Sequence, residues 1–567
     1  MISVIVGVSF VLLAVGYFTY GRRVANRMDL DDSRPTPAHT MSDGVDYVPA
    51  STPLLLGQHF SAIAAAGPIV GPILAGMYFG WLPALLWIVL GSIFVGGVHD
   101  FTSLLASVRH KATSIGEIIR LYMSRTSRVL YLVFVWVTLT YVIIAFADIT
   151  AHTFKATAGD EAFGPAVAVS SGLYLLVGVI MGIVLYKFRV KLWIATLIAL
   201  PLVFGAIWVG DVLPPAAVAR LDQVSVKQWE VVLLAYCFIA SLIPMWLLLQ
   251  PRGYLGGWFL YLTMAVALAG ALFGGFNVQY PALNLHGLQG ADTGKLIFPV
   301  LFITVACGAC SGFHGIVAAG TTSKQVDRES NTFPVGYGAM ILEGGVAVLA
   351  LATVMMLARG DAVLSKDPNF IYANGIARYL GFIGISYKIA ISFALLAFST
   401  FVYDTLDVCT RLGRYVLQEL FGWSSRTGAF VATLLTLAPA LAFLMLTKDK
   451  GYLVAWTVFG TSNQLLAALT LLGVAVWLAH TGRKVIFAVA PMLFMLVVTV
   501  TSLWLLIKPF FQSLLSGAAV TAEMAVSGIV GVILLVLALW VVAEAVRLLA
   551  QGKVRAPIPE EGEATSA

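Results

Sequence analysis

Charged residues are scarce in this sequence. Asp, Glu, Lys and Arg make up 11% of the 567 residues, whereas a soluble globular protein carries about 25%. Hydrophobic residues reach 60%, which is more than a water-facing surface allows. This composition excludes a soluble enzyme and a disordered scaffold, and it predicts an all-α polytopic membrane protein whose solvent is the lipid bilayer. We therefore do not interpret the net charge of +6 as a sign of nucleic-acid binding.

Cysteine is equally rare. The chain has four cysteines, all in apolar stretches: Cys237, Cys307, Cys310 and Cys409. This placement excludes an ectodomain held together by disulfides. A nucleotide-binding P-loop is also absent, because GTTSK at 320–324 lacks the required glycine spacing. The loops are too short to hold a soluble catalytic domain, so the sequence predicts neither an enzyme nor a bound cofactor.

Long apolar runs are abundant instead. About fifteen segments reach the roughly 20 residues that a spanning helix needs. They cover residues 2–20, 54–76, 79–107, 128–148, 166–186, 192–210, 230–249, 255–275, 296–319, 336–358, 384–403, 428–446, 452–478, 485–507 and 524–547. The first has no basic residues before it and no small-residue cleavage site after it, which favours an uncleaved signal anchor.

Basic residues set the expected orientation. If the N-terminus is outside, most of the 34 Lys and Arg residues fall in loops on the inner side. These loops include 21–53, 109–128, 250–254 and 404–427. Because cytoplasmic loops are enriched in Lys and Arg, we expect the N-terminus outside and the C-terminus in the cytoplasm. Within the second of these loops, 113–125 resembles a short amphipathic helix.

Two of the expected spans contain helix breakers. The second reads GQHFSAIAAAGPIVGPILAG at 57–76, where Pro68 and Pro72 each follow a glycine, so we expect about one turn to unwind there. The ninth reads VACGACSGFHGIVAAGTTSK at 305–324, which is rich in glycine and contains Ser311 and His314. A simple kink and close helix packing are the alternatives.

The two interrupted spans are expected to cross the membrane in opposite directions. Discontinuous helices of opposite direction are typical of secondary transporters with inverted repeats, whose substrate lies between the breaks. Free N–H groups at half-helix N-termini suit an anionic group there. The expected substrate site comprises Gly67, Pro68, Gly71, Pro72, Ser311, Gly312 and His314.

Polar residues inside spans are functional candidates because they are costly in lipid. The candidates for proton or ion coupling are His59, His99, Asp100, Ser399, Thr400, Asp404 and Asp407, and further polar core positions are Asn463 and Gln464. Each has a structural alternative, such as a hydrogen bond or a position at the membrane interface. In particular, Asp404 and Asp407 have Arg411 and Arg414 as candidate partners, with Asp407 and Arg411 at helical spacing.

A metal or haem site is a weaker interpretation. His59, His99 and His314 lie on separate spans, and no two of them have the spacing of a helical metal site. Cys307 and Cys310 form a C-x-x-C pair, but no second pair follows, so close helix packing is the default. The sequence therefore predicts no metal.

Five stretches resemble the carbon starvation protein A (CstA) family. They are GQHFSAIAAAGPIVGP at 57–72, GGVHDF at 96–101, CGACSGFHGIVAAGTTSK at 307–324, TLDVCTRLGR at 405–414 and FGTSNQLLAALT at 459–470. The resemblance implies a bacterial inner-membrane transporter made during carbon starvation, in a family associated with uptake of peptides and of pyruvate with protons. It also implies membership of the amino acid–polyamine–organocation superfamily.

That superfamily implies a core of five plus five inverted helices of the leucine-transporter type. The second and ninth spans would be core helices one and six, with the seventh and eighth spans inserted between them. The eleventh span, with Ser399 and Thr400, would be core helix eight, and in such folds helices one and eight often hold a coupling Na⁺. A seven-plus-seven arrangement stays open.

The resulting hypothesis is a symporter for small carboxylates or peptides coupled to H⁺ or Na⁺. Its alternatives are a membrane-embedded oxidoreductase with His ligands and a starvation sensor, and the sequence sets no oligomeric state. The expected organisation is a helix at 1–20, a cytoplasmic loop at 21–53, a transporter core at 54–478 with the second repeat from about 296, peripheral helices at 479–550 and a disordered tail at 551–567.

Overall fold

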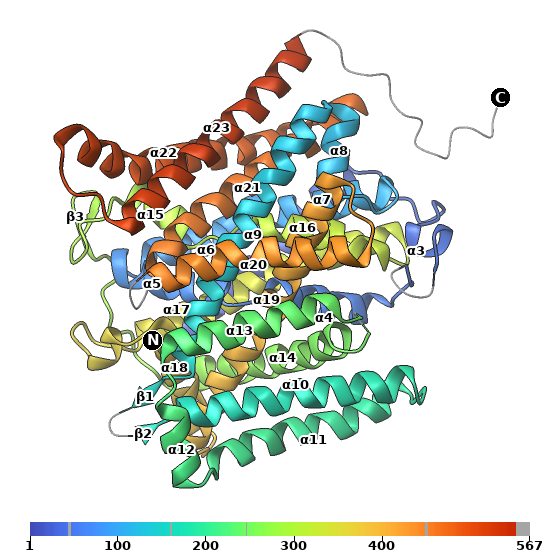
Figure 1. Cartoon of the computed structure of the whole chain (residues 1–567). Coiled ribbons are helices and arrows are strands. Elements are labelled where there is room, and N and C mark those ends of the chain that lie inside the picture. The colour runs from blue at the N-terminus through green and yellow to red at the C-terminus, as the bar shows by residue number, and fades with distance from the viewer. Residues whose placement is uncertain (44–46, 159–160, 245, 448–451, 551–567) are drawn as a thin grey trace.

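The computed structural model is a bundle of membrane-length helices (Figure 1). It describes residues 1–43, 47–158, 161–244, 246–447 and 452–550, so the tail expected to be disordered lies outside the described residues. Within them, twelve helices are long and apolar enough to span a membrane, or up to fourteen if two bent helix pairs each count as one span. A third interrupted pair occupies the ninth expected span, so the multi-pass α-helical fold predicted from composition is confirmed.

The first repeat begins with an interrupted helix. Its elements are α4 (Thr52–Ile63), α5 (Gly67–Phe79), α6 (Trp81–Gly91), η2 (Ser92–Gly96), α7 (Gly97–Arg109), α8 (Ile115–Tyr122), α9 (Arg125–Thr153), α13 (Val226–Leu242) and α14 (Leu249–Phe273). The predicted amphipathic helix at 113–125 is α8, and the Ser114 hydroxyl caps it by accepting from the Glu117 N–H.

The second repeat has the same order of elements. They are α15 (Ile297–Thr304), α16 (Gly312–Gly320), η3 (Thr322–Lys324), η4 (Glu329–Asn331), η5 (Phe333–Tyr337), α17 (Gly338–Met355), η6 (Ala362–Ser365), α18 (Pro368–Gly381), α19 (Tyr387–Phe421), α20 (Arg426–Leu446) and α21 (Tyr452–His480). Helix α19 continues through residues 404–421, which were expected to be a loop.

Contacts between the repeats give the five-plus-five arrangement. Helix α4 packs on α16 and α5 on α15, so the two interrupted helices cross antiparallel to each other. Helix α14 contacts α4 and α19, and its counterpart α21 contacts α16 and α9. The pair α13 and α20 each pack on both α9 and α19. These reciprocal contacts favour the five-plus-five repeat over seven plus seven.

The inserted helices differ from those expected. The seventh and eighth spans, now α13 and α14, are core helices, whereas the inserted pair is α10 (Gly164–Tyr186) and α11 (Leu192–Asp211) at one edge of the bundle (Figure 1). Only 44% and 33% of their apolar windows are buried. Hydropathy could not distinguish the two pairs, because core and lipid-facing helices are both apolar.

The remaining helices lie outside the two repeats. They are α1 (Ile2–Gly16), which continues through η1 (Tyr17–Gly21) and α2 (Arg22–Asn26), then α3 (Pro37–Thr40), α12 (Pro215–Asp222), α22 (Ile486–Ser516) and α23 (Ala522–Ala550). Helix α1 packs on α14 and α17, whereas α22 and α23 pack on α21. Two short hairpins complete the fold: β1 (Thr157–Ala158) with β2 (Glu161–Ala162), and β3 (Leu285–His286) with β4 (Gln289–Gly290).

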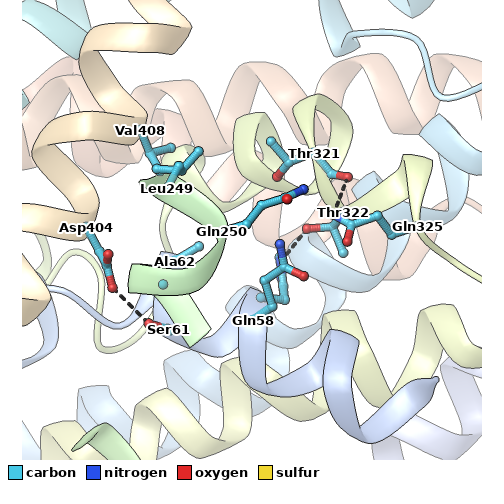
Figure 2. Close-up of a pocket in the computed structure, with 12 residues that line it drawn as sticks. Gln58, Ser61, Ala62, Leu249, Gln250, Thr321, Thr322, Gln325, Asp404 and Val408 are labelled. Atoms are coloured by element: carbon cyan, nitrogen blue, oxygen red, sulfur yellow. Dashed lines mark hydrogen bonds between the residues drawn. The ribbon is translucent and has the colours of Figure 1, made fainter. Parts of the chain in front are cut away.

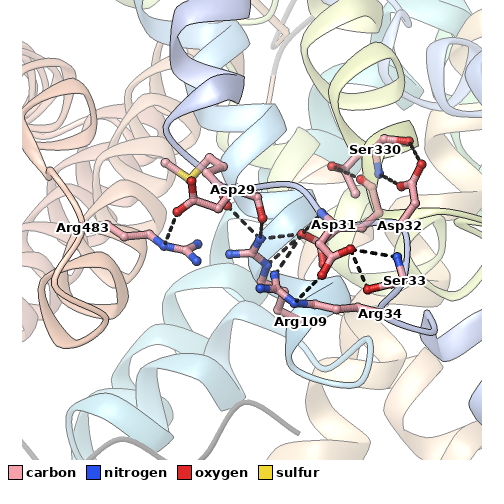
Figure 3. Close-up of polar contacts among 11 residues, drawn as sticks. Asp29, Asp31, Asp32, Ser33, Arg34, Arg109, Ser330 and Arg483 are labelled. Carbon is pink, nitrogen blue, oxygen red and sulfur yellow. Dashed lines mark hydrogen bonds and ion pairs between the residues drawn. The ribbon is translucent and has the colours of Figure 1, made fainter. Parts of the chain in front are cut away.

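Residues 27–43, here called the strap, follow α2 and are pinned to both repeats (Figure 3). Arg109 at the end of α7 donates to the backbone oxygens of Met28 (2.8 Å) and Asp29 (3.1 Å), and it pairs with Glu329 of η4. Asp32 in the strap accepts hydrogen bonds of 2.8 Å from both the N–H and the hydroxyl of Ser330. The strap therefore ties the α7 end of the first repeat to the start of α17.

Candidate functional site

The first break lies earlier than predicted. Helix α4 ends at Ile63, Ala64 leaves the helical region with ψ 66°, and α5 starts at Gly67. Residues 67–72 are therefore helical, and their predicted unwinding is wrong. Pro68 is accommodated in the first turn of α5, where backbone N–H groups have no acceptor within the helix. Pro72 lies inside α5 without ending it.

Gly67 and Gly71 allow close packing between the two interrupted helices. A Cβ added to Gly67 would lie 2.4 Å from Cys307 Sγ, and one added to Gly71 would lie 2.4 Å from the Thr304 backbone oxygen. No side chain larger than hydrogen fits there without movement. The glycines in the first turns of α5 therefore bring it against the end of α15 and the start of the second break, which is the packing alternative for this motif.

The second break spans residues 305–311, between α15 and α16. Asn463 of α21 holds it in place: its side-chain oxygen accepts from the Phe313 N–H at 2.9 Å, and its Nδ2 lies 3.0 Å from Ser311 Oγ. The neighbouring Gln464 donates to the Phe302 oxygen at 3.1 Å. Gly312 also permits close approach, because an added Cβ would lie 2.4 Å from the Ala467 nitrogen. Polar groups freed by the break are thus bonded to α21.

Four buried ionisable side chains form a continuous chain beside this break. His99 Nδ1 lies 2.7 Å from Asp100 Oδ1, and His314 Nδ1 lies 2.7 Å from Asp100 Oδ2. On its other side, His314 Nε2 lies 3.2 Å from Glu343 Oε2. All four side chains have no solvent exposure. These four side chains connect α7 of the first repeat to α16 and α17 of the second.

The sequence placed three members of this chain among its candidates but could not pair them. Asp100 and His314 are 214 positions apart, and only the antiparallel crossing brings them together. Glu343 was not among the predicted site residues, although a carboxylate within a span is itself a signal of function. Gly315 contributes to the approach of α16, because a Cβ there would lie 3.2 Å from His99 Cε1.

His59 is not hydrogen bonded to this chain of side chains. Its Nδ1 lies 2.8 Å from Thr322 Oγ1 of η3, and its buried Nε2 has no hydrogen-bond partner among the described residues. No hydrogen bond or ion pair among the described residues joins it to His99, Asp100 or His314.

A second buried cluster centres on Arg252 of α14. Its Nε donates to Asp404 Oδ1 of α19 at 2.9 Å, and its guanidinium also pairs with Asp407. Asp404 Oδ2 accepts from Ser61 of α4 at 3.0 Å, and Asp407 Oδ2 accepts from Tyr236 of α13 at 2.8 Å. Four helices therefore meet at one guanidinium with two carboxylates.

This cluster corrects two interpretations of the sequence. Arg252 was assigned to a cytoplasmic loop at 250–254, but it lies in α14 with 0% exposure. Asp407 pairs with Arg252 rather than with Arg411. Arg411 donates instead to the Ala240 and Ile243 oxygens at the end of α13, and Arg414 donates to the Ser241 oxygen. These guanidinium groups bind the free carbonyls of that helix end.

The hydroxyls expected to bind an ion are both on α19. Ser399 Oγ lies 2.9 Å from Ser171 Oγ of the inserted helix α10 and donates to the Leu396 oxygen. Thr400 Oγ1 is buried and has no hydrogen-bond partner among the described residues. Ser399 is therefore occupied by contacts on the α10 side of α19.

A small cavity of about 50 Å³ lies beside Ser61 and Asp404 of the Arg252 cluster (Figure 2). Its walls come from α4, α14, η3 and α19. The polar groups that line it include Gln58, His59, Gln250, Thr322, Gln325 and Asp404. It lies on the α4 side of the first break, and the predicted residues Gly67 to Pro72 do not line it.

One group of side chains in the described residues has metal-ligand character. Ligand-type atoms of Cys307, His314 and Glu343 lie within 4.8 Å of one another. However, both ring nitrogens of His314 already face carboxylate oxygens, at 2.7 Å from Asp100 and 3.2 Å from Glu343. That arrangement suits a buried proton shared between a histidine and two carboxyl groups.

Comparison with known proteins gives the family. The model for carbon starvation protein CstA matches residues 1–369 and 362–502. A peptide transporter CstA of Campylobacter jejuni is 31% identical over 86% of this chain and 77% of its own length. A peptide transporter CstA of Bacillus subtilis is 27% identical over 96% of this chain and 97% of its own. The pyruvate/proton symporter BtsT of Escherichia coli is 29% identical over 89% and 80%.

Solved structures are more distant. A mutant manganese transporter of Eremococcus coleocola is 14% identical and aligns with a TM-score of 0.46 over 89% of this chain and 99% of that one. MhsT in complex with L-phenylalanine is 13% identical, with a TM-score of 0.47 over 88% and 99%. The match to the family model, which spans most of the sequence, shows that this chain belongs to the carbon starvation protein CstA family.

Proposed function

We propose that this chain is a secondary active symporter that imports small carboxylates such as pyruvate, or short peptides, together with H⁺. Family membership supports transport, because relatives are named peptide transporters and a pyruvate/proton symporter. Two interrupted helices that cross antiparallel support alternating access around the breaks. The proposal needs no cofactor besides the coupling ion.

The observation that carries the proposal is the buried chain of His99, Asp100, His314 and Glu343. Burying a charge is costly unless it is paired, so adding or removing one proton here changes the stability of the whole contact. The chain connects α7 with α16 and α17 across the two repeats. A proton on His314 keeps Asp100 and Glu343 paired, and its loss leaves two carboxylates that repel each other. Proton binding can therefore favour one arrangement of the repeats over the other.

Arg252 favours H⁺ over Na⁺ as the coupling ion. The guanidinium lies between α4, α14 and α19 and already pairs with Asp404 and Asp407. Arg252, Ser61 and Tyr236 already donate to oxygens of both carboxylates, which leaves few ligand oxygens for a dehydrated Na⁺ ion. Ser399 is also directed to α10. Both features weaken the case for a Na⁺ site between α4 and α19.

The proposed physiological role of this protein is based on the name of its family. We infer a role in uptake during carbon starvation, in the bacterial inner membrane, with the N-terminus outside. A starvation sensor would need transport-independent activation of a partner, and a His-ligated oxidoreductase would need a bound redox centre. Cys307, His314 and Glu343 are the described group nearest to a redox metal site, but both ring nitrogens of His314 face carboxyl groups, which favours transport.

Uptake by the purified protein in liposomes tests the proposal. Labelled pyruvate and a labelled dipeptide are presented in parallel under an imposed pH gradient, an imposed Na⁺ gradient or neither. We expect accumulation only with the pH gradient, abolished by a protonophore. Accumulation driven by Na⁺ alone would replace H⁺ as the coupling ion. No accumulation of either compound by folded protein would contradict symport.

A further inference from the structure

The cavity between α4, α14, η3 and α19 is lined by an acidic side chain without a described basic one (Figure 2). Asp404 is its acidic residue, His59 is its other titratable residue, and no Lys or Arg among the described residues lines it. The cation that pairs with Asp404, Arg252, sits behind it and is shared with Asp407. Two carboxyl groups therefore share one guanidinium beside the cavity.

The backbone adds negative potential on the α4 side of the cavity. Ser61 and Ala62 line the cavity from the last turn of α4, which ends at Ile63. Carbonyl groups at a helix C-terminus are unpaired and carry the negative end of the helix dipole. An anionic group placed here would meet Asp404 and a helix C-terminus, without a described lining cation to pair with it. A cationic group would be stabilised by both.

Neutral hydrogen-bonding groups surround the rest of the cavity. The Tyr186 hydroxyl donates to the side-chain oxygen of Gln250 at 2.5 Å, which leaves the Gln250 amide N–H groups available to a ligand. Gln325 uses one N–H on the Thr321 oxygen at 3.2 Å and keeps its side-chain oxygen. His59 is 1% exposed, and its Nε2 has no hydrogen-bond partner among the described residues. Such a buried polar atom is costly unless something binds it.

We propose that this cavity binds the protonated amino group of an amino acid or a short peptide, with Asp404 as its counter-ion. Gln58, Gln250 and His59 would hydrogen bond to the adjoining amide or carboxyl oxygens. The volume of about 50 Å³ holds roughly three to four water-sized positions, enough for an ammonium group and its α-carbon. This inference rests on the proposed transport function and assigns it an amine-bearing substrate rather than pyruvate.

A ligand series tests the charge requirement directly. Binding of a dipeptide, of its N-acetylated form and of pyruvate is measured with the purified full-length protein by calorimetry, in potassium phosphate without added sodium. A charge-assisted hydrogen bond contributes about 1.5–3 kcal/mol, so removing the ammonium group should weaken binding by about ten- to a hundredfold. Equal binding of the dipeptide and its acetylated form, or binding of pyruvate alone, would overturn the inference.

Gly253 gives a variant at the wall of the cavity with room for a side chain at its own Cβ. It lines the cavity, and a Cβ added to it would have no described atom within 4 Å. We expect Gly253→Leu to abolish dipeptide binding. Gly172→Leu is the matched control, because Gly172 lies in the peripheral helix α10 and also has no described atom within 4 Å of an added Cβ. The melting temperature of both variants should stay near that of the unmodified protein.

The outcomes separate this inference from the transport proposal. One outcome is that the unmodified protein binds no dipeptide but takes up pyruvate with protons, and that Gly253→Leu keeps this uptake. This outcome would overturn the inference and leave symport standing. Dipeptide binding that Gly253→Leu abolishes, without accumulation under any gradient, would support the cavity and contradict coupled transport. Dipeptide binding that Gly253→Leu leaves unchanged would place the amine elsewhere and overturn the inference.

Discussion

Arg252 and Asp404 form a buried ion pair between α14 and α19, with Arg252 Nε 2.9 Å from Asp404 Oδ1. The guanidinium is fully buried, and Asp404 is 2% exposed. Since α14 and α19 belong to different repeats, this pair connects the two halves of the core. Ser61 extends the contact to α4, next to the first break. The pair thus links the interrupted helix to the helices around it.

Removing the guanidinium should destabilise the protein strongly. Arg252→Ala would leave Asp404 and Asp407 buried without a counter-ion, and breaking a buried pair in this way costs about 3–5 kcal/mol. We expect a large fall in the melting temperature of the detergent-purified variant. Arg359→Ala is the control, because Arg359 is 55% exposed in its pair with Asp292, and such pairs contribute little. Equal melting temperatures for the two variants would show that Arg252 is not the central charge of this cluster.

Glu343 offers a test of proton coupling that preserves shape. Glu343→Gln keeps the size of the side chain but fixes it in the neutral form, so His314 loses one of its two carboxylate partners. If the buried group of ionisable side chains that includes Glu343 carries the coupled proton, the variant should still exchange labelled for unlabelled substrate across the liposome membrane. It should fail to accumulate substrate under a pH gradient. Glu161→Gln, an exposed carboxylate paired with Lys388, should behave as the unmodified protein. Undiminished accumulation by Glu343→Gln would remove Glu343 from the mechanism.

Gly71 should tolerate no side chain. Its missing Cβ leaves room for the Thr304 oxygen, which would lie only 2.4 Å from an added carbon. Overpacking of this kind costs about 1–3 kcal/mol, so Gly71→Ala should melt at a lower temperature than the unmodified protein. Gly205→Ala on the peripheral helix α11 meets no described atom within 4 Å and should melt normally. Normal melting of Gly71→Ala would mean that α5 and α15 can separate at no cost.

Hydropathy and helix breakers predicted much of this fold because both report on local chemistry. The apolar runs gave the spans, and the glycine- and proline-rich stretches marked both interrupted helices. The exact position of the first break was missed, because Pro68 suits the first turn of a helix as well as it suits a break. Burial was equally hard to infer: Arg252 lies between two apolar stretches, as a loop arginine would.

The pairings within the site depend on distant segments. Asp407 and Arg411 have ideal helical spacing, yet the structure gives Asp407 a partner 155 positions away. Spacing along one helix says nothing about which neighbouring helix competes for the same carboxylate. The same limit applies to Asp100 and His314, which were both candidates but whose contact depends on the crossing of the repeats. Residue type in a membrane span identified polar side chains that the structure buries, but it did not predict their partners.

The strap between α2 and α4 tests both a contact and the orientation of the chain (Figure 3). Glu329 is 3% exposed and pairs with Arg109, which in turn holds the backbone of Met28 and Asp29. Glu329→Gln weakens this ion pair, so residues 27–34 should detach more often and trypsin should cleave faster after the exposed Arg27. Arg328→Ala, next to Glu329 but 68% exposed, should not change the rate.

Since we expect the strap in the cytoplasm, cleavage should occur in inside-out vesicles and not in right-side-out ones. Cleavage restricted to right-side-out vesicles would invert the proposed topology, and equal rates for all three proteins would show that Glu329 does not hold the strap.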